Sequence, residues 1–308
     1  MNYTHSVMFH HFHNEDHSKS QGSLSSSEFS EMLDWLDLKF NLLGAKEYLT
    51  RLNEGRLRSR DICLSFDDAL LCQHDIALPI LNERNLEAFF FVYSSIFTGQ
   101  PEKLEIYRYF RTNAYKNTDE FYEDFFQLVE CNFYDELINH KSKFSALDYL
   151  SAYPFYTEND RWFRYLRDQF LNQNIYNDLM HQLMERKNFS SEKIIDSLWM
   201  SEAHLKEIAK SGHEVGLHSF SHPTKISKLS YDAQKEEYIL NYNHLTKLLG
   251  TIVSMSHPCG DYNDDTLTIL SELGMQIGFR SSFNPRTIKS NLEIPREDHI
   301  NILKLMRL

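Results

Sequence analysis

Short apolar runs alternate with amphipathic segments in the first and last thirds of the chain, and this alternation constrains the fold more than any other feature. The clearest runs, residues 61–66 and 88–93, have the composition of buried strands. Further strands are predicted at residues 6–9, 213–220, 251–258, 275–281 and 300–305. Helical spacing of apolar residues predicts helices at residues 28–40, 74–85, 201–212, 231–250 and 263–274. Strands that alternate with helices predict parallel β-α-β units, and therefore an α/β fold.

Local signals indicate where some of these helices begin and end. Ser27 and Ser201 are predicted N-caps, because a serine hydroxyl can accept a hydrogen bond from the first helical turn. Gly212 is the predicted stop of the helix that begins after Ser201. Pro79 interrupts the predicted helix at residues 74–85.

Residues 98–198 break the alternation of strands and helices. The stretches 119–138, 161–171 and 175–189 are rich in aromatic residues and have helical patterns. We expect residues 1–308 to form one domain, with residues 98–198 as a helical insertion within it. The insertion is either a subdomain that packs on itself or a lid or substrate-recognition wall over the site, and both can hold.

The formal net charge of −12 narrows the range of partners. Nucleic acids and anionic membranes bind basic surfaces, so neither is expected as a partner. No run of about 18 apolar residues occurs, so no membrane span is expected. Residues 1–17 lack a basic segment followed by a long apolar stretch, and the four cysteines show no CxxC spacing. We therefore expect a cytoplasmic protein with free thiols.

Two pairs of polar residues follow predicted strands. Asp67 and Asp68 end the strand at residues 61–66, and like charges there are costly unless a cation, a proton or water offsets them. His218 and His222 follow another strand, and neutral imidazoles suit a divalent metal that a carboxylate helps to hold. Each pair alone is explained as well by a solvated strand end or by surface histidines. Together they are more informative, because sites in α/β folds form at the carboxyl ends of strands.

A third stretch, SHPCGDYND at residues 256–264, also follows a predicted strand. Pro258 and Gly260 predict a tight turn. Such a turn can direct the backbone N–H of Cys259 at a developing oxyanion. The alternative is an ordinary β-α turn in which Asp264 caps the next helix.

These stretches resemble the motifs of polysaccharide deacetylases of the NodB-homology type, carbohydrate esterase family 4. The family motif T-F-D-D-G corresponds to S-F-D-D-A at residues 65–69, and H-S/T-x-x-H corresponds to H-S-F-S-H at residues 218–222. The family stretch Y-P-Y-G-x-Y-N corresponds to H-P-C-G-D-Y-N at residues 257–263. Residues 198–223 also resemble the family's W-x-x-L-x-x-L-x-x-x-G-H-E-I-G-S-H-T run. The resemblance covers residues 1–97 and 199 to about 300, and the insertion lies outside it.

The resemblance implies a distorted (β/α)7 barrel and a metal-dependent hydrolase. It implies that Asp68, His218 and His222 bind a divalent metal, most often zinc, although such a set also accepts cobalt, nickel, manganese or iron. It implies that Asp67 is the general base and that the Cys259 N–H stabilises the oxyanion.

The general acid and the substrate contacts follow less directly from the resemblance. His299 is the predicted general acid, since family members use a late histidine, although its flanking residues do not match the family pattern. His257 is the alternative acid. The predicted substrate-binding residues are Trp199, His257, Pro258 and Arg296. Core packing is the alternative for Trp199, and His10 and His11 could line the pocket without an assigned role.

Three positions depart from the family pattern. Ala69 stands where the family has glycine, and Cys259 stands where it has tyrosine. Ser256 stands where well-characterised members have an arginine that orients the general base. Arg296 is a candidate substitute for that arginine.

The predicted function is removal of an N-acyl group, which the resemblance implies is acetyl, from an amino sugar. The absence of an export signal suggests a nucleotide- or lipid-linked intermediate of surface glycan synthesis as the substrate. Two alternatives are a hydrolase acting on a non-sugar amide and a barrel that binds a glycan without turning it over. The sequence does not predict the oligomeric state.

Overall fold

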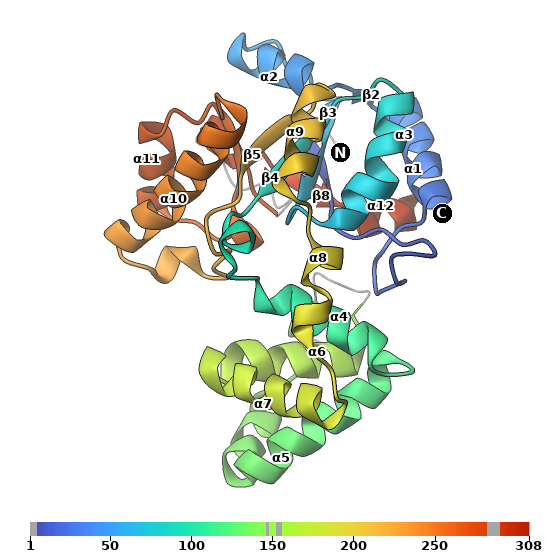
Figure 1. Cartoon of the computed structure of the whole chain (residues 1–308), viewed down its shortest axis with the longest axis vertical. Coiled ribbons are helices and arrows are strands. Elements are labelled where there is room, and N and C mark those ends of the chain that lie inside the picture. Colours follow the sequence, from blue (N-terminus) through green and yellow to red (C-terminus); the bar gives the residue numbers. More distant parts are fainter. Residues whose placement is uncertain (1–4, 146–147, 152–155, 282–289, 308) are drawn as a thin grey trace. The chain divides into compact units, whose positions relative to one another are not determined.

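The structure is a computed structural model that describes residues 5–145, 148–151, 156–281 and 290–307. The chain forms two compact units (Figure 1). The first comprises Met1–Glu102 and Ile195–Leu308, and the second comprises Lys103–Ile194. The second unit falls within the predicted insertion at residues 98–198, and its role as a lid or recognition wall stays a prediction.

The first unit is built on one parallel sheet. Its strands are β1 His5–Phe9, β2 Asn41–Leu42, β3 Asp61–Asp67, β4 Phe89–Val92, β5 Glu214–Leu217, β6 Ser254–Ser256, β7 Ile277–Phe279 and β8 Arg296–Asp298. Neighbouring strands follow the order β7-β6-β5-β4-β3-β1-β8, and β2 pairs with the start of β3. All of these pairs are parallel. The carboxyl ends of the strands therefore meet at one end of the sheet.

The sheet curls into a nearly closed barrel of seven strands, which confirms the predicted (β/α)7 architecture. Its two ends approach each other where Phe279 of β7 bridges Ile294, two residues before β8. There the N–H of Arg280 donates to the Ile294 carbonyl at 3.0 Å, and the N–H of Ile294 donates to the Gly278 carbonyl at 2.8 Å. Helices surround the strands (Figure 1).

The helices of the first unit mostly match the predictions. They are α1 Ser26–Lys39, α2 Ala45–Asn53, α3 Leu78–Glu83, α8 Ile195–Leu198, α9 Glu202–Lys210, α10 Tyr231–Leu249, α11 Asp264–Glu272 and α12 His299–Met306. Ser201 caps α9 as predicted. The cap of α1 is Ser25 instead of Ser27, because Ser25 and Glu28 form a reciprocal capping box.

The last predicted strand, residues 300–305, is wrong. These residues lie in α12, whose first turn is capped by the Asp298 side chain accepting from the N–H of Ile300 at 2.9 Å. A short apolar run does not distinguish a strand from a buried helix. The last strand is instead the short, polar β8, which the sequence pattern does not indicate.

Alternate residues of the strands face the inside of the barrel. Toward the amino ends of the strands the interior is apolar, and Tyr48 of α2 packs there with Phe89, Phe91 and Phe279. Toward the carboxyl ends it becomes polar, with the hydroxyl of Ser6 2.9 Å from that of Ser65. This polar end of the barrel holds the candidate site.

The second unit is helical. It contains α4 Lys103–Asn113, α5 Thr118–Lys143, α6 Glu158–Tyr165 and α7 Gln173–Arg186. The backbone of α5 is kinked at Phe133. The sequence patterns predicted α5, α6 and α7, whereas α2, α4 and α8 were missed. Among the described residues of both units, none of the helices is long and apolar enough to cross a membrane.

Candidate active site

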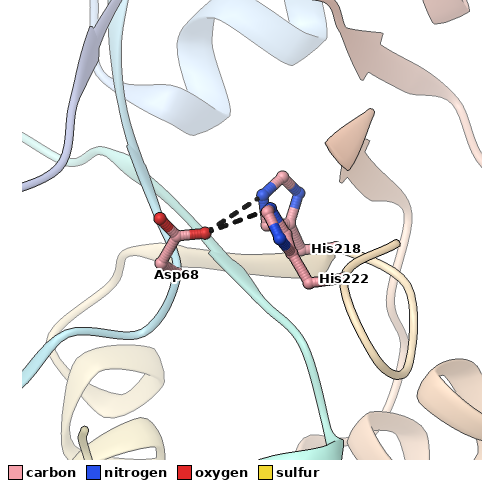
Figure 2. Close-up of side chains that lie close together, drawn as sticks. All are labelled: Asp68, His218 and His222. Carbon is pink, nitrogen blue, oxygen red and sulfur yellow. Dashed lines mark ion pairs between the residues drawn. The ribbon is translucent and has the colours of Figure 1, made fainter. Parts of the chain in front are cut away.

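Three side chains converge as the ligands of a metal site would. Asp68 follows β3, while His218 and His222 lie on the loop after β5 (Figure 2). Asp68 Oδ1 lies 3.4 Å from His218 Nε2 and 3.5 Å from His222 Nε2. One atom from each of the three lies within 4.8 Å of the others, and Asp68 Oδ1 is buried without a hydrogen-bond partner. A carboxylate oxygen and two imidazole nitrogens around one point fit a divalent cation that keeps an open position for water.

Neighbouring groups hold His218 in the tautomer that a metal requires. Its Nδ1 lies 2.9 Å from the Ser256 carbonyl, which can only accept, so Nδ1 carries the proton and Nε2 keeps its lone pair. The backbone N–H of His218 also donates to Asn241 Oδ1 at 3.0 Å. Asn241 is buried in α10, so the long helix after the histidine loop fixes the loop in place.

The backbone at the ligands adopts the sparsely populated left-handed conformation. The φ angles are +80° at Asp68, +52° at Ala69, +61° at Ser219 and +56° at His222. Non-glycine residues in this region are strained, and such strain persists where the surrounding structure enforces it. Ala69, at the family's glycine position, therefore keeps the glycine-like backbone despite its side chain.

The protonation states favour a cation at this point. Burial raises the pKa of Asp68, but the nearby His218, His222 and His10 outweigh burial and lower that pKa below its usual range. Burial lowers the pKa of His222 to about 4, so its ring is neutral at pH 7. An ionised carboxylate beside a neutral imidazole is the state in which both bind metal.

Asp67 points toward a different partner, the guanidinium of Arg296. Arg296 Nη1 lies 2.6 Å from Asp67 Oδ1, and Nη2 lies 2.7 Å from Oδ2, a bidentate pair. Arg296 Nε donates to the Arg280 carbonyl at 3.1 Å, and Arg296 is 1% exposed. Burial raises the pKa of Asp67, but the charges of Arg296 and His218 outweigh burial, so the pKa lies below its usual range and Asp67 is ionised. Arg296 thus lies where it orients Asp67, and its guanidinium is occupied by protein groups.

His10 lies closer to the two carboxylates than the sequence analysis indicated. Its Nε2 is 3.9 Å from Asp67 Oδ2 and 3.9 Å from Asp68 Oδ2, and 29% of its side chain is exposed. Buried Gln73 holds this arrangement, because its amide nitrogen donates to the His10 carbonyl at 2.8 Å and to the Asp67 carbonyl at 2.6 Å. The available signal was the position of His10 directly after the first strand. No sequence signal marked Gln73, which begins a π-helical turn.

His299, the predicted general acid, is buried at the start of α12. Its Nε2 is 2.7 Å from the Gly22 carbonyl and its Nδ1 is 3.2 Å from the Met8 carbonyl. Its ring stacks on Phe9 at 5.5 Å. Within the described part of the chain, no hydrogen bond or ion pair joins His299 to Asp67 or Asp68. Its catalytic role stays a prediction.

The turn after β6 places the remaining predicted residues. Cys259 has a φ of +52°, between buried Pro258 and Gly260. His257 is fully buried, its Nε2 donates to the Leu292 carbonyl at 2.8 Å, and its ring stacks on Tyr262 at 4.2 Å. Burial lowers the pKa of His257 to about 4. The ring of His257 therefore supports the turn from inside.

Trp199 lies behind the histidine loop and is 5% exposed. Its backbone bridges Leu70, and its ring contacts Tyr93 edge-on at 6.5 Å. Tyr93 in turn packs against the ring of His222 at 5.4 Å. The aromatic pair thus backs one of the three candidate ligands.

The comparisons with known proteins agree with this geometry. A family model described as polysaccharide deacetylase matches residues 172–278. The solved structure of the Streptococcus pyogenes deacetylase PplD in complex with acetate has a TM-score of 0.57 and 15% identity, covering 99% of this chain and 96% of that one. IcaB from Ammonifex degensii gives a TM-score of 0.55 and 14% identity, covering 96% of this chain and 91% of that one. A de-N-acetylase from Aggregatibacter actinomycetemcomitans gives a TM-score of 0.54 and 12% identity, covering 95% of this chain and 93% of that one. No curated protein matches the chain.

At these identities the solved structures show a shared fold. The parallel β/α barrel of this chain gathers two carboxylates and two histidines at the carboxyl ends of its strands, an arrangement that can bind a divalent cation and activate water. The family model matches residues 172–278, and the motifs at residues 65–69 and 257–263 resemble those of the same family.

Proposed function

We propose that the protein removes the N-acetyl group of an amino sugar by metal-dependent hydrolysis. The observation that carries this proposal is the convergence of Asp68, His218 and His222 beside an ionised Asp67. The family match and the deacetylase titles of the structural neighbours support an acetylated glycan as the substrate class.

Asp68, His218 and His222 would hold the divalent cation, and zinc suits one carboxylate and two imidazoles. Cobalt, nickel, manganese and iron accept the same ligands. When bound, such a cation polarises a carbonyl and lowers the pKa of a water molecule.

Asp67 is the proposed general base. Its carboxylate is ionised and held by two hydrogen bonds from Arg296, so both its charge and its orientation are set before substrate binds. It takes a proton from the attacking water as the oxygen of that water bonds to the amide carbon. The Cys259 N–H, at the end of a strained turn, is the proposed donor to the oxyanion that forms.

The C–N bond then breaks, and the leaving amine requires a proton. His10 is the proposed donor on geometric grounds, since it is partly exposed and lies 3.9 Å from the base. His299 remains the prediction made from the sequence alone. A His10→Gln variant should retain metal and lose most of its turnover if His10 is the donor, whereas loss confined to His299→Gln would reverse the assignment.

The finer parts of the proposal concern the substrate form and the site of action. We propose a cytoplasmic enzyme that acts on a nucleotide- or lipid-linked sugar, with residues 98–198 as its recognition or lid segment. Fractionation of cells that produce the native protein tests the location, and recovery from the medium or the periplasm would contradict it.

The central test combines metal analysis with acetate release from N-acetylhexosamines. We expect Asp68→Ala and His222→Ala to lose the metal, and Asp67→Asn to keep it while losing activity. Loss of metal in Asp67→Asn would contradict the separate roles of the two carboxylates. Release of acetate from simple amides but not from sugars would favour a non-sugar substrate, and metal-free, inactive wild type would favour a non-catalytic barrel.

A further inference from the structure

One carboxylate, that of Glu237, is bonded to the loop that carries two of the three candidate ligands. Glu237 Oε2 accepts from the backbone N–H groups of Phe220 and Ser221, at 3.0 and 2.8 Å, and its Oε1 accepts from the Ser221 hydroxyl at 2.6 Å. Both loop residues lie between His218 and His222 in the sequence. Helix α10, which carries Glu237, lies beside β5, the strand that leads into this loop (Figure 1). Glu237 therefore joins the helix to the middle of the ligand loop.

The charge of Glu237 is directed at these N–H groups and at the hydroxyl. Glu237 is half-buried, and none of the basic side chains within the described ranges forms an ion pair or a hydrogen bond with it. Hydrogen bonds to an ionised carboxylate are shorter than those to a neutral acceptor and roughly twice as strong. Glu237 therefore holds the loop more firmly than a neutral acceptor would.

The other side of the loop is fixed by the segment that follows β4. The Phe220 carbonyl accepts from the backbone N–H groups of Ser94 and Ser95, at 3.1 and 2.9 Å. The Ser94 hydroxyl in turn accepts from Asn241 Nδ2 at 2.6 Å. Glu237 and Asn241 are four residues apart on α10, so they lie on the same face of that helix. This face contacts the loop both directly and through Ser94.

The ring of His222 depends on the loop backbone more than the ring of His218 does. His218 Nδ1 donates to the Ser256 carbonyl at 2.9 Å, which orients the ring. His222 Nδ1 is buried and, among the described residues, has no hydrogen-bond partner. Its backbone N–H donates to Ser219 Oγ at 3.1 Å, and both residues have positive φ angles, +56° and +61°. Packing against Tyr93 and a strained backbone therefore position the His222 ring, and such strain persists only where the surroundings enforce it.

We propose that Glu237 is a positioning residue that holds His222 in place as a ligand. This role rests on the proposed function, since it concerns the same metal site. Without Glu237, the two N–H groups of the loop turn to water, and the strained backbone at Ser219 and His222 relaxes. His222 Nε2, now 3.5 Å from Asp68 Oδ1, then leaves the position in which the three ligands converge. Groups that orient a metal ligand from behind typically change metal affinity about 10–100-fold when they are removed.

Chelator competition with the full chain measures the dissociation constant for Zn²⁺. We expect Glu237→Ala to weaken Zn²⁺ binding about 10–100-fold. Glu237→Gln keeps an acceptor oxygen for the two N–H groups but loses the charge, so its dissociation constant should lie between those of wild type and Glu237→Ala. The matched control is Glu236→Gln, which removes the same charge from the preceding, exposed position of α10. It should bind Zn²⁺ as the wild type does.

Two further measurements distinguish positioning from a general effect on stability. The absorption spectrum of the Co²⁺-loaded protein reports the arrangement of its ligands, and it should change in Glu237→Ala but not in Glu236→Gln. Urea unfolding of the metal-free proteins measures stability separately. A Glu237→Ala variant with lowered stability but wild-type Zn²⁺ affinity and Co²⁺ spectrum would overturn the proposal, because Glu237 would then only brace the fold. If Glu237→Ala does not fold, Glu237→Gln carries the test, and its wild-type affinity would have the same consequence.

The metal measurements require no substrate, so the role of Glu237 and the proposed function fail separately. Wild type that binds Zn²⁺ but releases no acetate would contradict the proposed function and leave the role of Glu237 standing. Equal Zn²⁺ affinity of wild type and Glu237→Ala would remove the role of Glu237 and leave the proposed function standing. Wild type that binds no Zn²⁺ would contradict both.

Discussion

Replacing Arg296 with methionine would leave Asp67 as a buried carboxylate without its partner. The side chain of Arg296 is fully buried and that of Asp67 is 3% exposed, so water cannot replace the lost hydrogen bonds without rearrangement. Breaking a buried ion pair from one side costs about 3–5 kcal/mol. Removing the two hydrogen bonds of Arg296 also frees Asp67, the proposed general base, and a shift of about 1 Å in a catalytic group can reduce turnover about 100-fold.

Urea unfolding and acetate release measure the two effects on the same preparations. Arg296→Met should lose both stability and kcat while keeping its metal, because none of the three candidate ligands contacts Arg296 directly. The stability and kcat of Arg296→Lys should lie between those of wild type and Arg296→Met, since lysine restores the charge without the two parallel hydrogen bonds. The double variant Asp67→Asn/Arg296→Met should be less destabilised than the sum of the single variants, by roughly 0.5–3 kcal/mol.

The matched control is Arg84→Met. The guanidinium of Arg84 lies 2.6 Å from the carboxylate of Asp34, whose side chain is 69% exposed. An exposed pair contributes little, so the control should remain close to wild type. The reasoning is refuted if the free energy of unfolding of Arg296→Met lies within about 1 kcal/mol of the wild-type value and the variant keeps its turnover. It would then follow that Asp67 is held by another group.

Three further predictions follow from single positions. Gln73→Leu should remove the donor to the buried Asp67 carbonyl, at roughly 1–3 kcal/mol, and to the partly buried His10 carbonyl. Kinetics and unfolding should show a larger fall in kcat than change in KM, and unchanged turnover would contradict the proposed role of Gln73 in holding Asp67. Gly260→Ala should lower stability by at least about 1 kcal/mol and slow turnover, because φ is +67° and a Cβ would lie 2.0 Å from Ser281 Oγ. His213 has a pKa lowered by burial to about 4 from 6.5, and its Nδ1 accepts from the Ala88 N–H at 3.0 Å. The unfolded chain therefore binds more protons between these values, so stability should fall by up to about 3 kcal/mol as pH drops from 6.5 to 4, and His213→Gln should lack this part of the acid dependence.

The sequence by itself determined the α/β architecture and the candidate ligand set. Alternating strand and helix patterns predicted parallel β-α-β units, because burial on both faces of a strand and on one face of a helix leaves a local imprint. The family resemblance implied that these units close into a barrel. Asp68 and the pair His218 and His222 were predictable for a related reason. Each follows a recognisable strand, and parallel strands bring their carboxyl ends together whatever their separation in sequence.

Only the tertiary structure decided which groups complete the site. Arg296 contacts Asp67 across 229 positions, and this contact depends on a three-residue polar strand that closes the barrel and has no local signature. Gln73 joins His10 to Asp67 for the same reason, since strand register and a π-helical turn place it. Local pattern sets where an element forms, whereas long-range contacts between side chains depend on how the elements pack.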